Sequence, residues 1–274
     1  MATALELKTY DTVAELAEAV RRDGFAFMPG VLSADEVAHM CDLIDEIGPN
    51  PRANDRRHLR PRAADGSDSE GMFYEVHTKL LFNRHPWFLQ FLDREPVADV
   101  ADAVMGDDCH SIGMTGWITG PGRVDQSFHS DYQPIELPTE VMADPRVEIP
   151  VFTATAHYYL SDLDDALGPT QFIPGSHRAG RPPGEGETSF QGVEGQNILC
   201  NAGDVVLFRS DVWHRGTANT SSRTRYLLQV HYGRRMVVQK FPPYLDFHFD
   251  PDILAQATPR QRRYLGEHPF SNYD

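Results

Sequence analysis

The chain has 274 residues, of which 41% are hydrophobic and 24% are charged, and its formal net charge is −15. This composition is typical of a globular protein with a sizeable core, and the acidic balance argues against nucleic acid or an anionic membrane as a partner. The first residues, MATALELKTY, lack the basic start and apolar run of a signal peptide, and no stretch reaches transmembrane length. Three cysteines lie far apart without a CxxC motif, so we expect reduced thiols in a cytoplasmic protein.

The first hundred residues predict helices around one short strand. Apolar residues at helical spacing predict a helix over 11–22 that ends at Gly24, and the apolar run GFAFMPGVL follows as a strand. Ser33 and Glu36 have the spacing of a capping box, which predicts the start of a second helix. A third helix is predicted within residues 96–106, opened by a proline and ended by a glycine.

Residues 49–71 form a long polar segment with five arginines and no periodicity of its own. Such a segment is either functional or disordered, so it is a lid over an active site or a solvated insertion. The next stretch, MFYEVHTKLLF, offers Phe73, Tyr74 and Lys79 as residues of a pocket wall, or simply of the core. The stretch around 241–249 is a second candidate cover.

From residue 110 onward the pattern changes to short strands separated by Gly, Pro and Asp, which is typical of a β-sandwich or barrel. The predicted strands are 110–119, 126–130, 151–161, 170–174, 197–200, 204–209 and 223–233. The end of the chain predicts loop and short helices packed on the outside. No linker divides the chain into independent domains.

The segment QSFHSDYQP places His129 and Asp131 two residues apart, which in an extended strand directs both side chains to one face. Such a pair holds a divalent metal or is only a hydrogen-bonded surface pair. His214 lies in a short loop between two apolar segments, GDVVLF and RTRYLLQVHY. Two histidines and one carboxylate, with coordination positions left open, are the facial triad of non-haem iron(II) oxygenases.

Arg225 follows His214 by eleven residues, early in a predicted strand. An arginine that enters a β-barrel needs a partner, and a carboxylate ligand matches its planar fork of donors. The alternative is a surface arginine on an edge strand, as expected for Arg223.

Several segments together resemble the phytanoyl-CoA dioxygenase family of iron(II)- and 2-oxoglutarate-dependent oxygenases. They are RRDGFAFMPGVLSADEV (21–37), HSD (129–131), GPTQFIPGSHR (168–178), GDVVLFRSDVWHRGTANTS (203–221) and Arg225, in the family's order. The resemblance implies a mainly β fold with flanking α-helices, a double-stranded β-helix or cupin-like jelly roll, with iron held by His129, Asp131 and His214. We expect one domain over 1–274, with a helical part to about 106, a jelly-roll core over about 107–240 and an extension over 241–274.

The same resemblance assigns residues to the co-substrate. Arg225 matches the arginine that pairs with the distal carboxylate of 2-oxoglutarate, and Gln126 and Thr170 match positions that contact it. The alternatives are a plain loop residue for Gln126 and a hydroxyl satisfied by backbone for Thr170. Ser176 and His177 match a structural turn of the family, so they are no hydrolase pair, which would need a G-x-S-x-G elbow.

One position departs from the family pattern. His157 stands where many members have Trp, so it contacts substrate or co-substrate or is a satisfied core histidine. The further candidates for substrate contact are Phe73, Tyr74, Lys79 and Trp213.

The activity implied is oxidation of an unactivated C–H bond by iron(II), 2-oxoglutarate and O2, with hydroxylation, desaturation, epoxidation or ring formation as the outcome. Related halogenases have a small residue in place of Asp131, so this carboxylate argues against halogenation. We expect a small-molecule substrate from secondary metabolism; the oligomeric state, a homodimer included, stays open. The alternatives are a cupin isomerase or hydrolase with another metal, or a cupin-like binding protein, and Arg225 argues against both.

Overall fold

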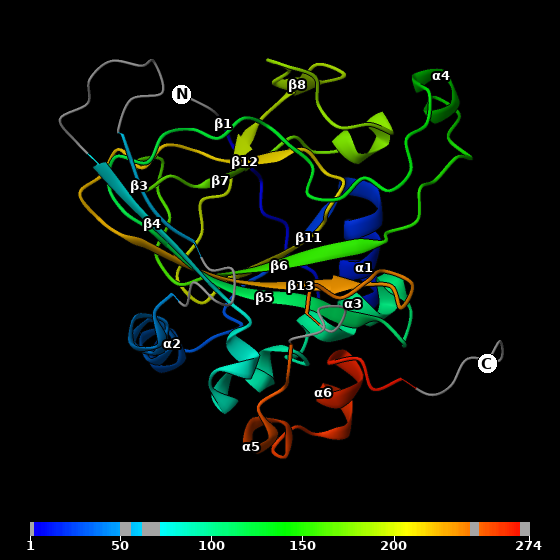
Figure 1. Cartoon of the computed structure of the whole chain (residues 1–274). Coiled ribbons are helices and arrows are strands. Elements are labelled where there is room, and N and C mark those ends of the chain that lie inside the picture. The colour runs from blue at the N-terminus through cyan, green and yellow to red at the C-terminus, as the bar shows by residue number, and fades with distance from the viewer. Residues whose placement is uncertain (1–2, 50–55, 62–71, 242–246, 269–274) are drawn as a thin grey trace.

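The computed structural model describes residues 3–49, 56–61, 72–241 and 247–268. Two β-sheets face each other in it (Figure 1). Residues of both sheets line one cavity. The larger sheet has the strand order β2-β11-β6-β13-β5-β4-β3 and the smaller one β1-β10-β7-β12. In chain order, the strands of the larger sheet are β2 (Phe25–Met28), β3 (Arg56–Pro61), β4 (Met72–Lys79), β5 (His110–Thr119), β6 (Thr153–Tyr159), β11 (Val205–Arg209) and β13 (Arg225–Gly233). Those of the smaller sheet are β1 (Thr3–Ala4), β7 (Thr170–Phe172), β10 (Gln196–Asn197) and β12 (His214–Gly216), and β8 (Ser189–Phe190) and β9 (Val193–Glu194) form a separate ribbon.

This arrangement is the double-stranded β-helix that the sequence predicts, a jelly roll of mainly antiparallel strands with helices on its outside. Strands distant in sequence pair at the centre of the larger sheet, where β13 lies between β5 and β6. Because successive side chains alternate between the faces of a strand, each central strand directs one set of side chains to the outer face of the sheet and the other set to the cavity.

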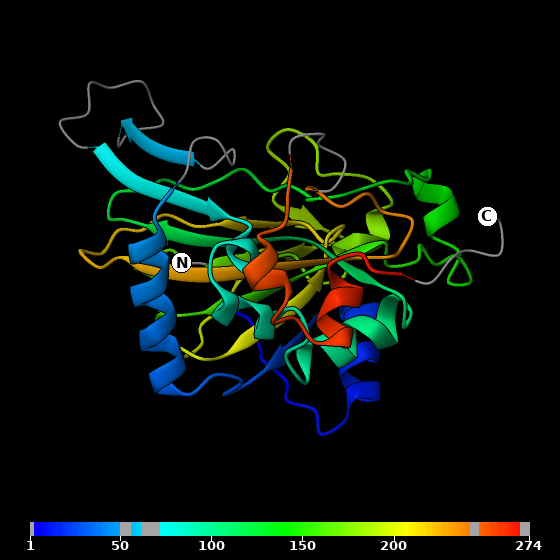
Figure 2. The same ribbon diagram turned by 60° about the horizontal axis from the view of Figure 1, so that its bottom comes forward.

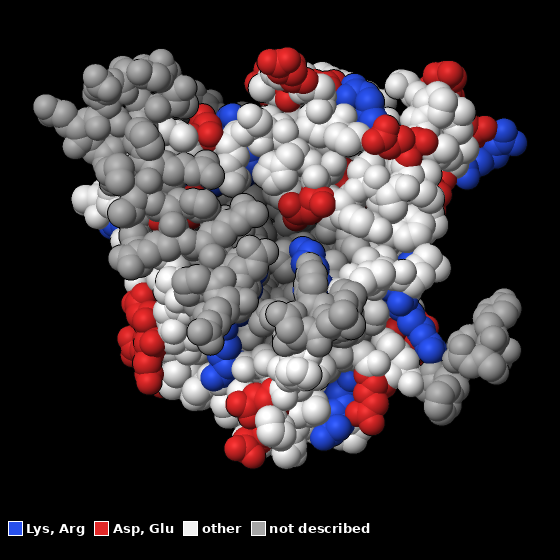
Figure 3. All heavy atoms as spheres, in the orientation of Figure 1, with Lys and Arg blue, Asp and Glu red and all other residues white. Residues whose placement is uncertain are grey.

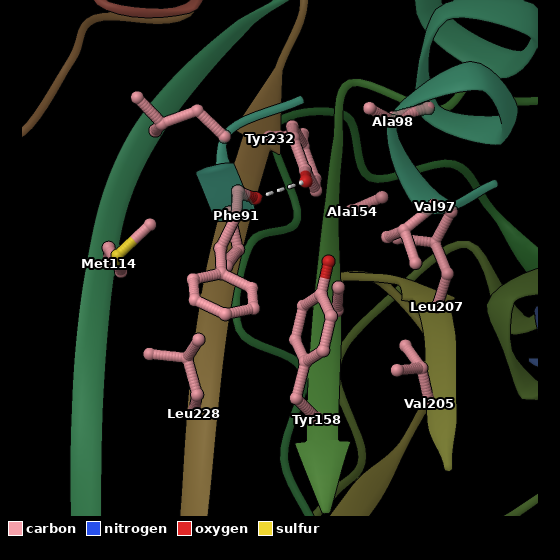
Figure 4. Close-up of a cluster of buried hydrophobic side chains, with 14 of the residues drawn as sticks. Phe91, Val97, Ala98, Met114, Ala154, Tyr158, Val205, Leu207, Leu228 and Tyr232 are labelled. Carbon is pink, nitrogen blue, oxygen red and sulfur yellow. Dashed lines mark hydrogen bonds between the residues drawn. The ribbon is translucent and has the colours of Figure 1, made fainter. Parts of the chain in front are cut away.

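The outer face of the larger sheet carries the larger of the hydrophobic clusters, whereas a second cluster joins Phe208 and Leu227 to Phe172 of the smaller sheet. Figure 4 shows Met114, Ala154, Tyr158, Leu228 and Tyr232 from β5, β6 and β13 packed in one cluster. Their neighbours in sequence point to the other face and line the cavity: Thr115, Thr155, His157, Gln229 and His231. The polar residues of these strands are therefore kept out of the core by register alone.

Helices cover this outer face (Figure 2). They are α1 (Val13–Asp23), α2 (Ala34–Ile47) and α3 (Val97–Met105). The 3₁₀ helices Leu81–Asn83 and Pro86–Phe91, which lie between β4 and α3 in the chain, contribute to the same layer. The Ser33–Glu36 capping box forms as predicted, and Thr12 with Glu15 makes a second one at α1. Gly116 permits the close approach of this layer, since a Cβ there would lie 3.0 Å from Leu81 Cδ1.

The interpretation of the first hundred residues as helical missed a hairpin. β3 and β4 pair with each other, and β4 pairs with β5, so the hairpin extends the larger sheet. Thus residues 56–61, within the segment expected to be a loop, form a strand, whereas 50–55 and 62–71 lie outside the described residues. The alternation in MFYEVHTK is a period-two pattern that indicates this strand.

The strand expected at 126–130 does not form. His129 makes one isolated bridge to His214, while the amides of Gln126 and Asp131 donate to the carbonyls of Gly216 and Ser210 at 2.9 and 2.8 Å. These bonds anchor the segment at irregular intervals instead of building a ladder.

The end of the described chain folds as short helices against the outside, as predicted. α5 (Pro251–Leu254) lies near the 3₁₀ helix Leu81–Asn83, and α6 (Pro259–Tyr264) packs near β5. Arg263 of α6 donates two 2.9 Å hydrogen bonds to Asp102 of α3, which ties this segment to the helical layer. Cys41, Cys109 and Cys200 are unpaired, as expected. Across the described ranges, no helix combines the length and apolar character needed to cross a bilayer.

The two faces of β13 predict opposite responses to truncation. Leu228→Ala removes a fully buried side chain from the outer core and should lower the free energy of unfolding by about 2–5 kcal/mol. Gln229→Ala removes a cavity residue with one hydrogen bond to His157 and should cost less, about 0.5–1.5 kcal/mol. Urea unfolding followed by circular dichroism measures both, and equal losses would mean that the faces are not assigned correctly.

Candidate metal centre and co-substrate site

Three side chains from distant parts of the chain converge at one end of the cavity. One ligand atom from each of His129, Asp131 and His214 lies within 4.8 Å of the others. The Asp131 carboxylate lies 3.7 Å from Nε2 of His129 through one oxygen and 3.7 Å from Nε2 of His214 through the other. His214, the first residue of β12, is buried, whereas His129 and Asp131 are about 40% exposed, at 40% and 38% of the side chain.

Backbone hydrogen bonds place the two histidines side by side. The His129 amide donates to the His214 carbonyl at 3.0 Å, and the His214 amide donates back at 2.9 Å. Directly opposed residues of an antiparallel pair present their side chains on the same face, and the two imidazole centroids are 4.4 Å apart. Two residues separated by 85 positions in sequence are thus fixed as neighbours by main-chain geometry.

The hydrogen bonds of the rings fix the tautomers. Nδ1 of His129 lies 3.0 Å from the Ser127 carbonyl, and Nδ1 of His214 lies 3.0 Å from the Val212 carbonyl. A carbonyl only accepts, so each Nδ1 carries the proton and each Nε2 presents its lone pair towards Asp131. This is the arrangement that holds a histidine ready as a metal ligand.

The charges of the three groups suit a divalent cation. Desolvation tends to raise the pKa of Asp131, but electrostatic interactions with His214, His231, His129 and Lys240 outweigh it and lower that pKa. Burial is the main reason that the pKa of His214 is lowered. An ionised carboxylate and two neutral imidazoles are the donor set that iron(II) takes in a facial triad, so the residues fit the metal.

Arg225 opens β13 in the wall of the same cavity. Its side chain is buried, at 4% exposure, and Nη1 donates to the Gly168 carbonyl. Within the part of the chain that the structure describes, Nε has no hydrogen-bond partner and no carboxylate forms an ion pair with the guanidinium. Burial and the neighbouring Arg123 lower the pKa of Arg225 to about 10. A buried cation without an anion is costly, so the site favours an anionic ligand.

The cavity has a volume of about 330 Å³ and contains the other expected residues of the co-substrate site. Thr170 lines it from β7, and Gln126 lines it from the segment before His129. Oε1 of Gln126 accepts from the Gly216 amide at 2.9 Å, which leaves the amide group of this side chain to donate.

The structure places His157 in the cavity wall, and its role there stays a prediction. It lines the cavity from β6, and it is also buried, with Nε2 2.8 Å from the Gln229 amide nitrogen. Burial, followed by the charges of His214 and Arg225, holds the pKa of His157 well below its ordinary value. Its Nδ1 has no partner in the described ranges, so a neutral imidazole keeps one free ring nitrogen.

The other substrate candidates have mixed outcomes. Lys79 lines the cavity as predicted. Trp213 does not: it is fully buried, its Nε1 donates to the Arg181 carbonyl at 2.9 Å, and it packs against Phe190. The assignment of Trp213 as a substrate contact is therefore wrong, because its ring fills a separate small core. Phe73 and Tyr74 belong to β4, but their side chains lie outside the described residues, as does part of the stretch 241–249.

Comparison with known proteins places this site in a family. The model of the family described as phytanoyl-CoA dioxygenase matches residues 20–227, which is more than half of the chain. The chain belongs to the phytanoyl-CoA dioxygenase family. This confirms the family and the fold that the sequence predicts, and the members of this family are iron(II)- and 2-oxoglutarate-dependent oxygenases.

Individual relatives are distant. An uncharacterised protein of Mycobacterium tuberculosis is 23% identical over 197 residues, which cover 69% of this chain and 66% of that protein, just under two thirds of its length. The ectoine dioxygenase of Stutzerimonas stutzeri is 22% identical over 245 residues, covering 80% of this chain and 76% of that protein. Among solved structures, the epimerase SnoN in complex with Fe3+, alpha ketoglutarate and nogalamycin RO has a TM-score of 0.62 at 17% identity, covering 87% of this chain and 92% of that one.

Sequence reasoning named Lys79 in the wall of this dioxygenase-family cavity but missed its neighbours Glu75 and His77 and the nearby Arg123. Nε2 of His77 lies 2.9 Å from a Glu75 carboxylate oxygen, and Nε of Arg123 lies 3.5 Å from the other. The His77 ring lies against Trp117 with 3.4 Å between centroids and the ring planes tilted by 37°. Glu75, His77 and Lys79 occupy alternate positions of β4, so the period-two pattern carried the signal. Recognition of β4 as a strand would have revealed it.

The face drawn in Figure 3 carries acidic and basic side chains next to one another. Among the described residues that line the cavity, cations outnumber carboxylates: Lys79, Arg123, Arg215, Arg225 and Lys240 stand against one carboxylate, Asp131. The excess negative charge of the chain, −15, therefore does not extend into the cavity.

Changing each member of the triad to alanine should abolish tight metal binding while the fold survives, because the larger hydrophobic cluster lies on the other face of the sheet. We expect the affinity for iron(II) or nickel(II), measured by calorimetry under argon, to fall by roughly 100-fold or more in each variant. His39→Ala, which changes an exposed histidine of α2, is the matched control and should bind like the parent. Parent-like binding by all three triad variants would contradict the assignment.

Proposed function

We propose that the chain is an iron(II)- and 2-oxoglutarate-dependent oxygenase that oxidises an unactivated C–H bond of a polar small molecule. The observation that carries this proposal is the presence, in one cavity, of an open His129–Asp131–His214 cluster and a buried arginine without an anion. A metal site alone is compatible with many reactions. The presence of Arg225 in the same cavity supports a reaction that also uses a dicarboxylate.

In this proposal His129, Asp131 and His214 hold the iron through two Nε2 atoms and one carboxylate. Iron(II), together with 2-oxoglutarate and O2, supplies the oxidising power that removes a hydrogen atom from an unactivated C–H bond. The work of the chain is to orient the reactants and limit the access of water. The Asp131 carboxylate supports hydroxylation, desaturation, epoxidation or ring formation over halogenation.

Arg225 is the proposed anchor of the co-substrate. Its fork of donors suits the distal carboxylate of 2-oxoglutarate, and pairing would stabilise a charge that burial and Arg123 disfavour. Gln126 has an amide group free to donate, and Thr170 offers a hydroxyl from β7 of the smaller sheet. We propose that both contact the co-substrate.

The substrate is proposed to be a small polar compound of secondary metabolism. The cavity is lined by polar residues of β4, β6 and β13, including Lys79, Thr155, Gln229 and His231. The similar structure of SnoN was solved with nogalamycin RO, and a distant relative is named for ectoine, so the fold accommodates quite different small molecules. We further propose that residues 1–274 act as one dioxygenase domain, and the three unpaired cysteines are compatible with the cytoplasm.

An isomerase or hydrolase that used another metal on the same barrel has no need of a buried arginine opposite the metal ligands. A non-catalytic binding protein has no need of an open triad. The isomerase or hydrolase therefore leaves the buried arginine unexplained, and the binding protein leaves the metal ligands unexplained.

Turnover of the co-substrate is the direct test. The purified protein with iron(II), ascorbate and 2-oxoglutarate should release succinate, and a panel of natural products should identify the compound that accelerates this release and gains an oxygen atom or loses two hydrogens. Mass spectrometry of succinate and of the product measures both. Absence of succinate under all conditions, with metal bound, would favour the alternatives.

Arg225→Ala should raise the 2-oxoglutarate requirement sharply, since loss of a buried charged partner costs roughly 2–5 kcal/mol in binding. Arg225→Lys should restore only part of the affinity, because an ammonium lacks the planar fork. Arg223→Ala is the matched control, since Arg223 pairs with Asp164 at the surface. The KM for 2-oxoglutarate in the succinate assay reports the outcome, and a parent-like value in Arg225→Ala would disprove the anchor.

A further inference from the structure

A second cavity, of about 320 Å³, lies at the other end of the larger sheet. It is formed where β11 and β13 end and β6 begins, beside the last turns of α1 and α3 (right side of Figure 1). Four arginines line it: Arg21, Arg178, Arg209 and Arg234.

The positive charge of this cavity is only partly balanced. Arg209 is neutralised by Asp211 through two hydrogen bonds of 2.6 and 2.8 Å. The single carboxylate among the described lining residues is Glu148, an exposed side chain. Three guanidinium groups thus face one carboxylate, in a protein whose net charge is −15.

The three remaining arginines are held in place by neutral groups. Arg21 donates to the Ala103 carbonyl at 2.5 Å, Arg178 to the Met142 carbonyl at 3.4 Å, and Arg234 to the Val151 and Val104 carbonyls at 2.7 and 3.3 Å. Within the described ranges, none of the three forms an ion pair. Carbonyls position a guanidinium without cancelling its charge, so the groups are oriented and remain available to an anion.

His177, in the wall of the cavity, lies in the electrostatic field of these arginines. It lines the cavity at 5% exposure, and its Nδ1 has no hydrogen-bond partner among the described residues. Burial, followed by the charges of Arg209 and Arg178, holds the pKa of His177 well below its ordinary value.

We propose that this second cavity is a binding site for a small oxyanion with at least two negative charges. Planar guanidinium groups match the oxygens of phosphates and carboxylates, and three of them favour a multiply charged ligand over chloride. A phosphate-bearing metabolite and a polycarboxylate share this chemistry. The site is distinct from the metal cavity and does not depend on the proposed oxygenase activity.

The cavity also adjoins the metal centre through one short segment. Arg209 lines the second cavity, whereas Ser210 and His214 line the first, and the Ser210 carbonyl accepts the Asp131 amide at 2.8 Å. An anion bound beside Arg209 therefore lies against the segment that carries one metal ligand and anchors another.

Calorimetry on the full-length protein tests the site with two probes, inorganic phosphate and tricarballylate. Both are titrated at constant ionic strength and without 2-oxoglutarate, because this dianion would itself compete for the site; the Arg225→Gln variant separates any binding of the probe at Arg225. We expect saturable binding of at least one probe at one equivalent. Phosphate binding alone would indicate a phosphate-bearing ligand, and tricarballylate binding alone a polycarboxylate.

Variants separate this site from general electrostatic attraction. Arg21→Gln with Arg178→Gln should weaken the binding of the probe roughly tenfold or more, since two charge-assisted contacts are lost. Arg22→Gln with Arg146→Gln removes the same charge from two exposed arginines already paired with Asp23 and Asp144, and should change the affinity by less than about twofold. The Arg225→Gln variant should keep the site, which distinguishes it from the co-substrate pocket. No saturable binding of either probe, or equal weakening in the two double variants, would overturn the proposal.

Discussion

The candidate metal centre depends on two backbone hydrogen bonds, the reciprocal pair between His129 and His214. Among the described residues this bridge is isolated, and the amides of Gln126 and Asp131 hold the same segment on either side of the pair that sets the spacing of the two imidazoles. Main-chain bonds are insensitive to the identity of the neighbouring side chains. The site therefore tolerates an irregular, polar surrounding sequence while its two nitrogen ligands stay in register.

The second constraint is the register of the larger sheet. A strand alternates faces with a period of two, so β6 and β13 supply Tyr158 and Leu228 to the core and His157 and Gln229 to the cavity. A shift of one residue would bury the polar set and expose the apolar one. The same hydrophobic energy that stabilises the fold thus directs the polar residues of the cavity.

Much of this organisation was predictable from the sequence, because the relevant signals are local. Helix caps at Ser33 and Gly106 and the apolar runs of β5 and β11 lie where the patterns predict. The metal ligands and Arg225 were predicted by a resemblance to family motifs, and the structure brings these residues into one cavity. The less local features were not predicted. The β3–β4 hairpin begins within a segment whose polarity concealed it. The contacts of Trp213 depend on Arg181 and Phe190, which no spacing rule brings together.

The segment Arg209–His214, together with the strand β11 that leads to it, is also held in place by Gly24 and β2 near the beginning of the chain. The Arg209 amide donates to the Gly24 carbonyl at 2.9 Å, and β11 pairs along its length with β2. Residues 25–28 make no contribution to the lining of the metal cavity, yet they brace the strand that leads to His214 and to the carbonyl that anchors Asp131. The amino-terminal strand is consequently a mechanical support of the active centre. Fraying of this strand would therefore loosen two metal ligands at once.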